Sequence, residues 1–454
     1  MAGWLGAHFS NRAIDRGRVL VARVRRRRQL MAHATGPAAD RESGNVHFDC
    51  ETCQASPLCS VDANGEAAVK VLLVTNFAPH YRAPFFERLA AAMDVEFIFF
   101  SEGTEPYWQQ HLGTTEVDVQ ATTIVGRPLG AGLNLNPRLA RELWTRDYDV
   151  LVKCVNGRLE LASAYAIAQV RRKPFVLWTT IWWHPVTLLG WFSQPPIQRV
   201  YRGADAVIAD GSQISRFIAG HGVDPAKLFT AEPAVDNSRF MQPVGGAERD
   251  AVRASLGAAE RPLILAVSRL VPGKGLDGLV RAAERLIDLD PVVAIVGTGP
   301  LAEQLTAQAN DGGVDLHLLG GQPPDSMPPL YAAADVYVMP SVTTPRVREP
   351  WGLGVNEAHC QSVPVVVSDA VGAAAGGLVV HNESGLIVPE RDDGALADAL
   401  RRVLSNRSFA GRLAAAGHTR VQATNYDAMV ESFEAAIDFA IAAHSVRRPL
   451  RRAR

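Results

Sequence analysis

The fold class follows first from residues 263–276, which read Leu-Ile-Leu-Ala-Val-Ser-Arg-Leu-Val-Pro-Gly-Lys-Gly-Leu. Five consecutive apolar residues predict a buried parallel strand, because both faces of such a strand are covered. A turn with Pro272 and two glycines follows, and apolar residues then recur at helical spacing at positions 276, 279, 280, 283, 286 and 287. Strand, turn and helix in this order indicate an α/β fold with a parallel sheet.

The same alternation extends on both sides of this unit. Strands are expected at 69–75, 95–100, 150–155, 175–178, 205–209, 292–296, 315–319, 336–339 and 364–368, and helices at 84–93, 159–170 and 427–443. The polar stretch 237–262 contains Pro243 and a Gly-Gly pair, which predict a linker. We therefore expect two Rossmann-like, doubly wound domains that face each other across a cleft, with ligands at the carboxyl ends of the strands.

The predicted domain boundaries follow from these patterns. Residues 1–68 are expected to be a basic, largely disordered extension, since they have Arg runs and no sustained periodicity. One Rossmann-like domain is expected at 69–240 and a second at 241–425. Residues 426–454 are expected to form a last helix and a basic tail.

Composition and charge restrict the function classes. The 454 residues are 47% hydrophobic and 20% charged, as in an ordinary globular enzyme. Eight Arg lie in residues 1–31 and five in residues 445–454. Because the net charge of the whole chain is only −1, the part between these basic ends is acidic. An acidic body argues against nucleic-acid binding. No apolar stretch reaches the roughly 18 to 20 residues that span a bilayer, and no secretory signal is evident, so a cytoplasmic protein is expected.

The five cysteines do not suggest a disulfide framework. Cys154 and Cys360 lie in apolar runs and are expected to be buried thiols, as in a reducing compartment. The other three, with a histidine, give His47-x2-Cys50-x2-Cys53-x5-Cys59, a compact set of four potential zinc ligands. Since no folded pattern surrounds this set, free thiols are the preferred interpretation and no metal is expected.

The turn at 268–275 carries Arg269 and Lys274 between a strand and a helix. Two cations, two glycines and a helix N-terminus suit a diphosphate, because each supplies positive charge or N–H donors to the phosphate oxygens. The alternative is a solvated surface turn.

A second cluster is Glu349-Pro-Trp-Gly-Leu-Gly-Val-Asn-Glu357, with two carboxylates eight residues apart. Pro350 and the glycines place Glu349 in a loop and Glu357 on the following helix. Gly352 and Gly354 permit a ligand to approach the backbone, and carboxylates can accept hydrogen bonds from sugar hydroxyls. The alternative is a pair of exposed surface acids.

Together these clusters resemble the retaining glycosyltransferases of family 4, which are the glycosyl transferases group 1 with the GT-B fold. The resemblance covers about residues 69–440 and includes the turn Ser-Arg-Leu-Val-Pro-Gly-Lys-Gly, the segment from Gly320 to Asp335, the Pro340-Ser341 step, the E-x7-E motif and the run from Asn382 to Pro389. It implies an acceptor domain at 69–240 and a nucleotide-sugar donor domain at 241–425.

The resemblance also implies roles for individual residues. Arg269 and Lys274 would hold the donor diphosphate and stabilise its charge as it leaves, so that no metal and no cofactor is required. Glu349 would contact the transferred sugar, and the backbone of Gly352, Leu353, Gly354 and Val355 would approach the sugar and the phosphate. Glu357 would bind the ribose, and the segment at Leu319 would border the nucleobase. The configuration at the anomeric carbon would be retained.

In the N-terminal domain, similar enzymes have an active-site histidine after the strand that corresponds to 175–178. His184 is the matching residue, and it would contact the sugar or the reacting hydroxyl. A lone histidine beside tryptophans is otherwise a packed side chain. The loop at 76–82 also resembles one branch of the family but lacks the usual paired glycines.

The expected partners are a nucleotide-sugar donor and a glycan, lipid-linked or small-molecule acceptor. The Trp-rich segment 182–192 and the basic ends further suggest contact with an anionic membrane, for example the inner face of the plasma membrane. Two alternatives stay open: a nucleotide-sugar epimerase, and an inert sugar-nucleotide-binding protein of the same fold.

Overall fold

The computed structural model describes residues 69–103, 117–130, 133–186 and 188–447. The four potential zinc ligands from His47 to Cys59 lie outside these residues, as do the basic extension and the end of the C-terminal tail. The described residues belong to one compact unit that begins at Val69.

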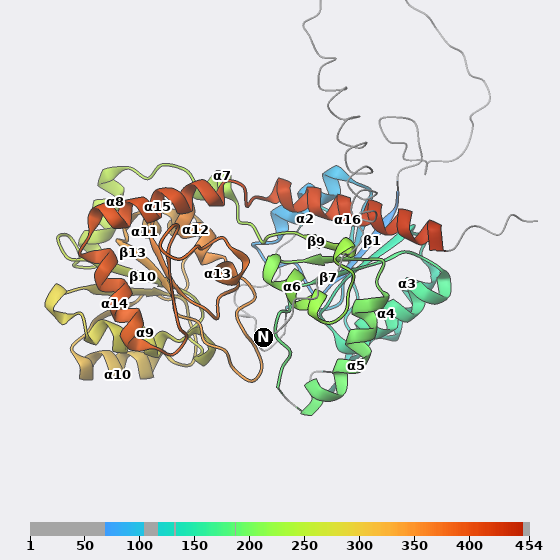
Figure 1. The fold of residues 1–454 in the computed structure, drawn as a ribbon, viewed down its shortest axis with the longest axis horizontal. Helices are drawn as coiled ribbons and strands as arrows, with labels where there is room; N and C mark the ends of the chain where they lie inside the picture. Colours follow the sequence, from blue (N-terminus) through green and yellow to red (C-terminus); the bar gives the residue numbers. More distant parts are fainter. Residues whose placement is uncertain (1–68, 104–116, 131–132, 187, 448–454) are drawn as a thin grey trace, which may run out of the picture. The chain divides into compact units, whose positions relative to one another are not determined.

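A seven-stranded sheet forms the centre of the N-terminal lobe (Figure 1). All its strands are parallel, in the order β3-β2-β1-β6-β7-β8-β9. Its order reverses between β1 and β6, where parallel α/β sheets place their ligands. The strands are β1 (Val71–Thr75), β2 (Val95–Phe99), β3 (Ala121–Thr123), β6 (Val150–Cys154), β7 (Phe175–Thr179), β8 (Ala206–Ala209) and β9 (Leu228–Thr230).

A six-stranded parallel sheet forms the centre of the C-terminal lobe, in the order β12-β11-β10-β13-β14-β15. The predicted α/β class with two doubly wound sheets is therefore confirmed. Its strands are β10 (Leu263–Val267), β11 (Val292–Val296), β12 (Asp315–Leu318), β13 (Val336–Met339), β14 (Val365–Ser368) and β15 (Leu386–Val388).

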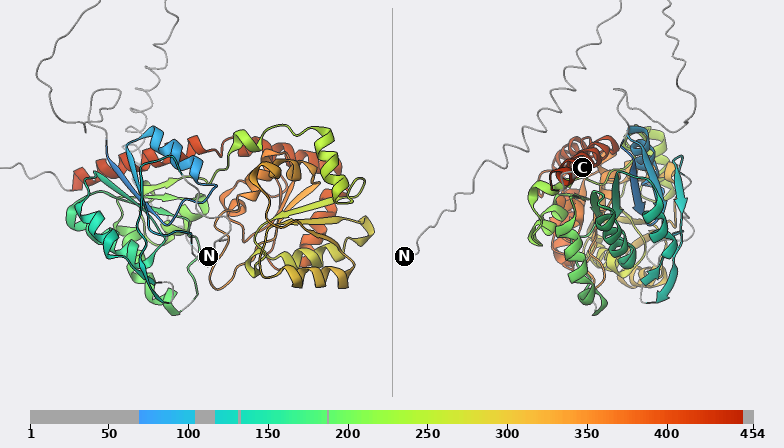
Figure 2. Two further views of the ribbon diagram at one scale, coloured as in Figure 1. Left: turned by 180° about the vertical axis from the view of Figure 1, so that it is seen from behind. Right: turned by 90° about the vertical axis from the view of Figure 1, so that its right-hand side faces the viewer.

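Helices cover both faces of each sheet (Figures 1 and 2). Separate apolar cores form on the two faces, since alternate strand residues point to opposite sides. The helices are α2 (Ala83–Ala92), α3 (Pro137–Thr145), α4 (Arg158–Arg171), α5 (Leu188–Gly203), α6 (Ser212–Gly220), α7 (Asn237–Phe240), α8 (Gly246–Ser255), α9 (Leu276–Glu284), α10 (Ala302–Gly312), α11 (Met327–Ala333), α12 (Gly354–Cys360), α13 (Gly372–Gly376), α14 (Asp393–Leu404), α15 (Arg407–Val421) and α16 (Tyr426–Arg447).

The last helix, α16, returns to the N-terminal lobe and packs against β7, β8 and β9. Phe433 anchors it, with its ring centroid 4.9 Å from Phe85 and 5.2 Å from Trp178. The helix is therefore part of the N-terminal core, although it follows the C-terminal lobe in sequence (Figure 1).

Most predicted strands and helices are confirmed to within one or two residues. The structure adds β3, β9, β15 and an antiparallel pair, β4 (Arg127–Gly130) and β5 (Leu133–Leu135), which the sequence did not predict. These strands are only three or four residues long, which is too short for the continuous apolar run that predicts a strand, and β3 and β4 are also largely exposed. Cys154 and Cys360 are buried free thiols, as expected.

Candidate functional site

The loop after β10 carries the two predicted cations at the carboxyl end of the C-terminal sheet. Lys274 ends a short 3-10 turn (Pro272–Lys274), and Gly275 follows with a positive φ of 64°. A Cβ atom at Gly275 would lie only 2.1 Å from the carbonyl oxygen of Pro340. The glycine is therefore required for the loop after β10 to pack against the loop after β13.

This packing brings Lys274 to Glu349. Lys274 Nζ lies 2.5 Å from Glu349 Oε2, and each side chain is only 15% exposed. The Ser341 hydroxyl also donates to the same carboxylate oxygen, at 3.4 Å. A buried ion pair has to be well hydrogen-bonded to offset its lost hydration. The structure thus joins two of the residues that the sequence singled out, 75 positions apart.

Glu357 lies on α12, as predicted, and faces a different partner. The Tyr331 hydroxyl donates to Glu357 Oε2 at 2.6 Å. Burial raises the pKa of Glu357 to about 7, and the Tyr331 hydrogen bond opposes this shift. Near neutral pH the side chain is therefore poised between carboxylic acid and carboxylate.

The glycines between the two acids have packing roles. Gly352 has a φ of 99°, and a Cβ there would lie 2.5 Å from the sulfur of Met339. At Gly354 a Cβ would lie 2.2 Å from the Tyr337 hydroxyl. Leu353 and Val355 complete this turn, and the Val355 amide donates to the Gly352 carbonyl at 3.0 Å. The backbone of 352–355 is thereby fixed directly between Glu349 and Glu357.

The loops after β11 and β12 complete this edge of the sheet. Leu319 follows β12, and the neighbouring Gly320 carbonyl accepts from the Gly297 amide at 2.7 Å. Cβ atoms at Gly297 and Gly299 would lie 1.9 Å and 2.4 Å from the carbonyl oxygens of Ser268 and Leu270. These two glycines pack against the Arg269 turn and were missed by the sequence argument, although Gly-Thr-Gly directly after an apolar strand is the signal for a close approach.

Residues of the N-terminal lobe hold the segment that carries Glu349. Trp182 Nε1 donates to the Glu349 carbonyl at 2.9 Å, and Gln213 Nε2 donates to the Pro350 carbonyl at 3.1 Å. The Val186 amide donates to the Pro345 carbonyl at 2.8 Å. The position of Glu349 therefore depends on both lobes.

A buried charged network lies at the carboxyl ends of β7 and β8. Asp210 accepts from Trp178 Nε1 at 2.6 Å and lies 3.5 Å from Arg82 Nη2. Burial raises the pKa of Asp210 to about 6, against the opposing effects of Arg82 and Trp178. Burial likewise raises the pKa of the Tyr81 phenol. The charges that act on Tyr81 come from both lobes: Arg82, Asp210, Glu349 and Arg269.

His184 lies in a cluster of aromatic rings. Its ring centroid is 5.1 Å from Phe217, 5.2 Å from His221 and 6.0 Å from Tyr201. Burial lowers the pKa of His184, and its Nε2 atom is buried without a hydrogen-bond partner among the described residues. The contacts of His184 are thus with α5 and α6, whereas Trp182, two residues earlier, is the side chain that reaches Glu349.

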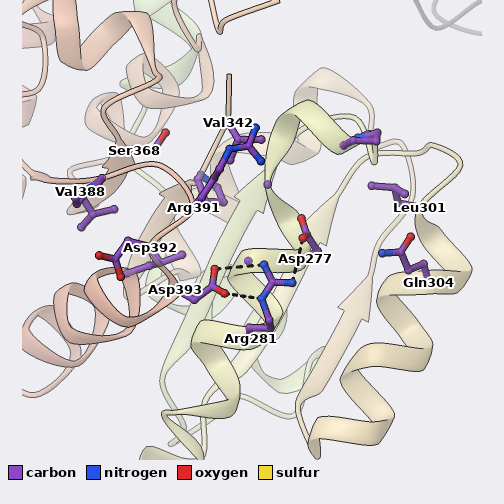
Figure 3. Close-up of a pocket in the computed structure, with 16 residues that line it drawn as sticks. Asp277, Arg281, Leu301, Gln304, Val342, Ser368, Val388, Arg391, Asp392 and Asp393 are labelled. Atoms are coloured by element: carbon purple, nitrogen blue, oxygen red, sulfur yellow. Dashed lines mark hydrogen bonds and ion pairs between the residues drawn. The ribbon is translucent and has the colours of Figure 1, made fainter. Parts of the chain in front are cut away.

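A separate cavity of about 290 Å³ lies in the C-terminal lobe, behind the Lys274 turn (Figure 3). It is lined by Gly275, Asp277, Arg281, Arg391 and Asp393 among others. Arg281 pairs there with Asp393 at 2.5 Å and with Asp277 at 3.1 Å. None of the four charged candidates lines this cavity.

Comparison with known proteins finds relatives of the C-terminal lobe. Residues 248–420 match the family model of the glycosyl transferases group 1. A GDP-mannose-dependent alpha-(1-6)-phosphatidylinositol monomannoside mannosyltransferase of Mycobacterium tuberculosis is 37% identical over 248 residues, which are 52% of this chain and 63% of the relative. A D-inositol 3-phosphate glycosyltransferase of Geodermatophilus obscurus is 33% identical over 257 residues, 53% of each protein. The chain thus spans about half to two thirds of the length of these relatives.

Solved structures share the fold of both lobes. Anabaena Alr3699/HepE, crystallised with UDP, is similar with a TM-score of 0.64 at 21% identity, over 81% of this chain and 98% of that one. The glycosyltransferase WaaG, which is involved in lipopolysaccharide biosynthesis, gives a TM-score of 0.60 at 15% identity, over 81% and 99%. The chain therefore has the predicted GT-B fold. In the part of the chain that the structure describes, no helix is both long and apolar enough to cross a bilayer.

Proposed function

We propose, from the premise that residues 248–420 belong to the glycosyl transferases group 1 family, that the whole chain transfers a sugar from a nucleotide-sugar donor to an acceptor. The observation that carries the proposal is the ion pair of Lys274 and Glu349, which joins the two sequence clusters at the carboxyl ends of the C-terminal sheet. The natural ligand of this edge in a doubly wound sheet is a nucleotide.

The chemistry required of the site is stabilisation of a leaving diphosphate. Lys274 supplies a point charge and Arg269 a forked donor, both on a loop whose shape the glycines fix. A diphosphate that binds Lys274 competes with Glu349 for the ammonium group, so Glu349 becomes available to a sugar hydroxyl. Glu357 accepts from the ribose, and Leu319 borders the base. The proposed reaction uses no metal and retains the anomeric configuration.

The relatives favour particular substrates. One is named for GDP-mannose and a phosphatidylinositol monomannoside, and the other for inositol 3-phosphate. Both names contain an inositol that carries a phosphate. We therefore propose GDP-mannose as the first donor to test and a phosphorylated inositol, free or lipid-linked, as the first acceptor. A lipid-linked acceptor agrees with a peripheral position at the cytoplasmic face of the membrane.

The decisive experiment separates donor binding from transfer. Thermal unfolding is measured with GDP-mannose, UDP-glucose and ADP-glucose, since a ligand at 100 times its dissociation constant stabilises by about 2.7 kcal/mol. Stabilisation by one sugar nucleotide in the wild type, lost in Lys274→Ala, is the expected result. If no sugar nucleotide stabilises the protein, the proposal is wrong.

Incubation of the donor with and without acceptor tests the two alternatives. A transferase forms product only when an acceptor is present, whereas an epimerase converts the sugar nucleotide alone and an inert binding protein does neither. Proton NMR of the product gives its anomeric configuration, and turnover in excess EDTA tests the proposed independence from metals.

A further inference from the structure

Five large apolar side chains are exposed on neighbouring elements of the N-terminal lobe. They lie on the β4–β5 pair, α3 and α4, and their exposed fractions are 59% for Leu129, 49% for Leu135, 53% for Trp144, 38% for Leu159 and 66% for Val170. Scattered apolar residues on a surface need no explanation, but a contiguous group marks an interaction site. We call this surface the α3–α4 face.

On α4 the exposed residues form a stripe. Leu159, Ala162, Ala166 and Val170 are all exposed and are spaced by three or four residues, so they share one side of the helix. The opposite side carries Leu161, Ala164 and Ala168, which are buried against the sheet. The helix therefore presents apolar residues on both sides, and its outer side has no covering element among the described residues.

The other elements extend this stripe. Arg171 Nη1, at the end of α4, donates to the Leu143 carbonyl of α3 at 2.9 Å, so the end of α4 that carries Val170 packs against the helix that carries Trp144. At the other end, β5 contacts α4, and Asn136 links β5 directly to the first turn of α3. Figure 1 shows α3 and α4 next to each other at the outer edge of the N-terminal lobe.

The exposed charged residues of β4 and α3 are arginines, and the exposed acid that follows α3, Asp147, pairs with Lys70 at 2.9 Å. Arg127 on β4 and Arg138 and Arg141 on α3 are exposed, and no guanidinium of the three has an ion pair or hydrogen bond within the described ranges. The acid of α3, Glu142, is occupied by Arg146 at 2.8 Å. No acidic residue of β4, β5, α3 or α4 is exposed.

We propose that the α3–α4 face docks on an anionic lipid bilayer. Unpaired arginines beside exposed leucine, valine and tryptophan fit a surface of negative headgroups over hydrocarbon, where arginine stems and tryptophan rings keep their polar ends in water. A nucleic acid would match the charge but not the apolar stripe. Docking at this face would bring the proposed transferase to a lipid-linked acceptor. Only this biological purpose rests on the proposed function; the binding to the bilayer does not.

The test uses the full chain and measures binding to sedimented vesicles. The vesicles contain phosphatidylcholine alone or with one third phosphatidylserine or phosphatidylinositol. The variant R127Q/R138Q/R141Q should bind the anionic vesicles about 100-fold more weakly than the wild type, since each basic residue contributes about 1 kcal/mol and 1.4 kcal/mol is tenfold. The control R249Q/R407Q/R412Q removes three exposed arginines of the C-terminal lobe and should bind like the wild type.

A second readout tests insertion of the apolar side chains. Brominated acyl chains should quench part of the tryptophan emission of the wild type, and that part should be absent in Trp144→Phe. The variant L129S/W144S/V170S should bind at least tenfold more weakly. Circular dichroism should be unchanged in all variants, because every altered side chain is exposed.

Equal vesicle binding by the wild type and the arginine variant overturns the proposal. So does a shift of L129S/W144S/V170S to a smaller species in light scattering with no change in lipid binding, because the face would then join two copies of the chain. Loss of vesicle binding alongside normal donor stabilisation leaves the transferase proposal intact, whereas failure of donor binding alone leaves the membrane proposal intact.

Discussion

Replacing His359 by leucine should remove an acid sensitivity from the core of the C-terminal lobe. His359 lies on α12, two residues after Glu357, and is fully buried. Both ring nitrogens lack a hydrogen-bond partner in the described part of the chain. The fit is tight, because a Cβ at Gly417 on α15 would lie 2.2 Å from Nδ1. Burial therefore disfavours a protonated imidazole here, and the Val363 backbone opposes this effect only in part.

The expected magnitude follows from the pKa. Burial lowers the pKa of His359 from 6.5 to about 3, and the charges of His418 and Arg420 act in the same direction. Below pH 6.5 the unfolded state binds a proton that the folded state rejects, so the stability contribution present above pH 6.5 is lost as the pH falls toward 3. At about 1.4 kcal/mol per pH unit, the loss is about 2 kcal/mol at pH 5 and about 5 kcal/mol over the full range.

Urea unfolding at pH 8, 7, 6 and 5, followed by far-ultraviolet circular dichroism, measures this effect. The fall in unfolding free energy from pH 8 to pH 5 should be about 2 kcal/mol larger for the wild type than for His359→Leu. Other titrating groups are common to both proteins and cancel in the difference. Parallel curves for the wild type and His359→Leu would refute the reasoning.

Three further changes test the site. Lys274→Ala should reduce turnover by about 10² to 10³-fold with unchanged circular dichroism, and near-normal transfer would exclude Lys274 from phosphate binding. Burial raises the pKa of Glu357 to about 7 from 4.5, so its folded form retains a proton that the unfolded chain has lost, and stability falls as the pH rises through this window. Glu357→Gln should therefore have a higher unfolding free energy than the wild type at pH 8, by at most about 3 kcal/mol, because solvent screens the partly exposed side chain. The variant should also bind sugar nucleotides more weakly. A lower unfolding free energy of the variant at pH 8 would contradict this. Gly275→Ala should lower the melting temperature by several degrees, because its Cβ would lie 2.1 Å from the Pro340 carbonyl, whereas Gly246→Ala on α8, with nothing within 4 Å, should not; equal melting points would disprove the close approach.

The sequence predicted those elements whose signals are local. A buried parallel strand such as Leu263–Val267 is a continuous apolar run, and the turn after it contains its own glycines and cations. The position of Glu349 in a loop and of Glu357 on a helix followed equally from Pro350 and the glycines. The three-residue strands β3 and β9 and the β4–β5 pair lack such runs, so only pairing with their neighbours defines them.

Contacts between distant segments could not be predicted in this way. Nothing in the sequence near Trp182 indicates that its indole reaches the Glu349 carbonyl, 167 positions away. The same is true of the Tyr331 hydroxyl that meets Glu357, since its spacing of 26 residues matches no helical or strand period. His184 was selected by its position after a strand, and its catalytic role stays a prediction.

The hydrogen bonds between the lobes bear on how the site works. Two different interactions hold Glu349: an ion pair between its carboxylate and Lys274, and a neutral hydrogen bond from the Trp182 indole to its backbone carbonyl. A donor diphosphate would compete mainly for the first, because the charged ammonium group of Lys274 attracts phosphate more strongly than the neutral indole N–H of Trp182 does. The loop can therefore stay in place while the carboxylate is released. For the same reason the position of Glu349 is sensitive to the N-terminal lobe, to which Trp182 belongs. In the proposed transferase, the Lys274 ion pair and the Trp182 indole would together link a bound donor to an acceptor in the N-terminal lobe.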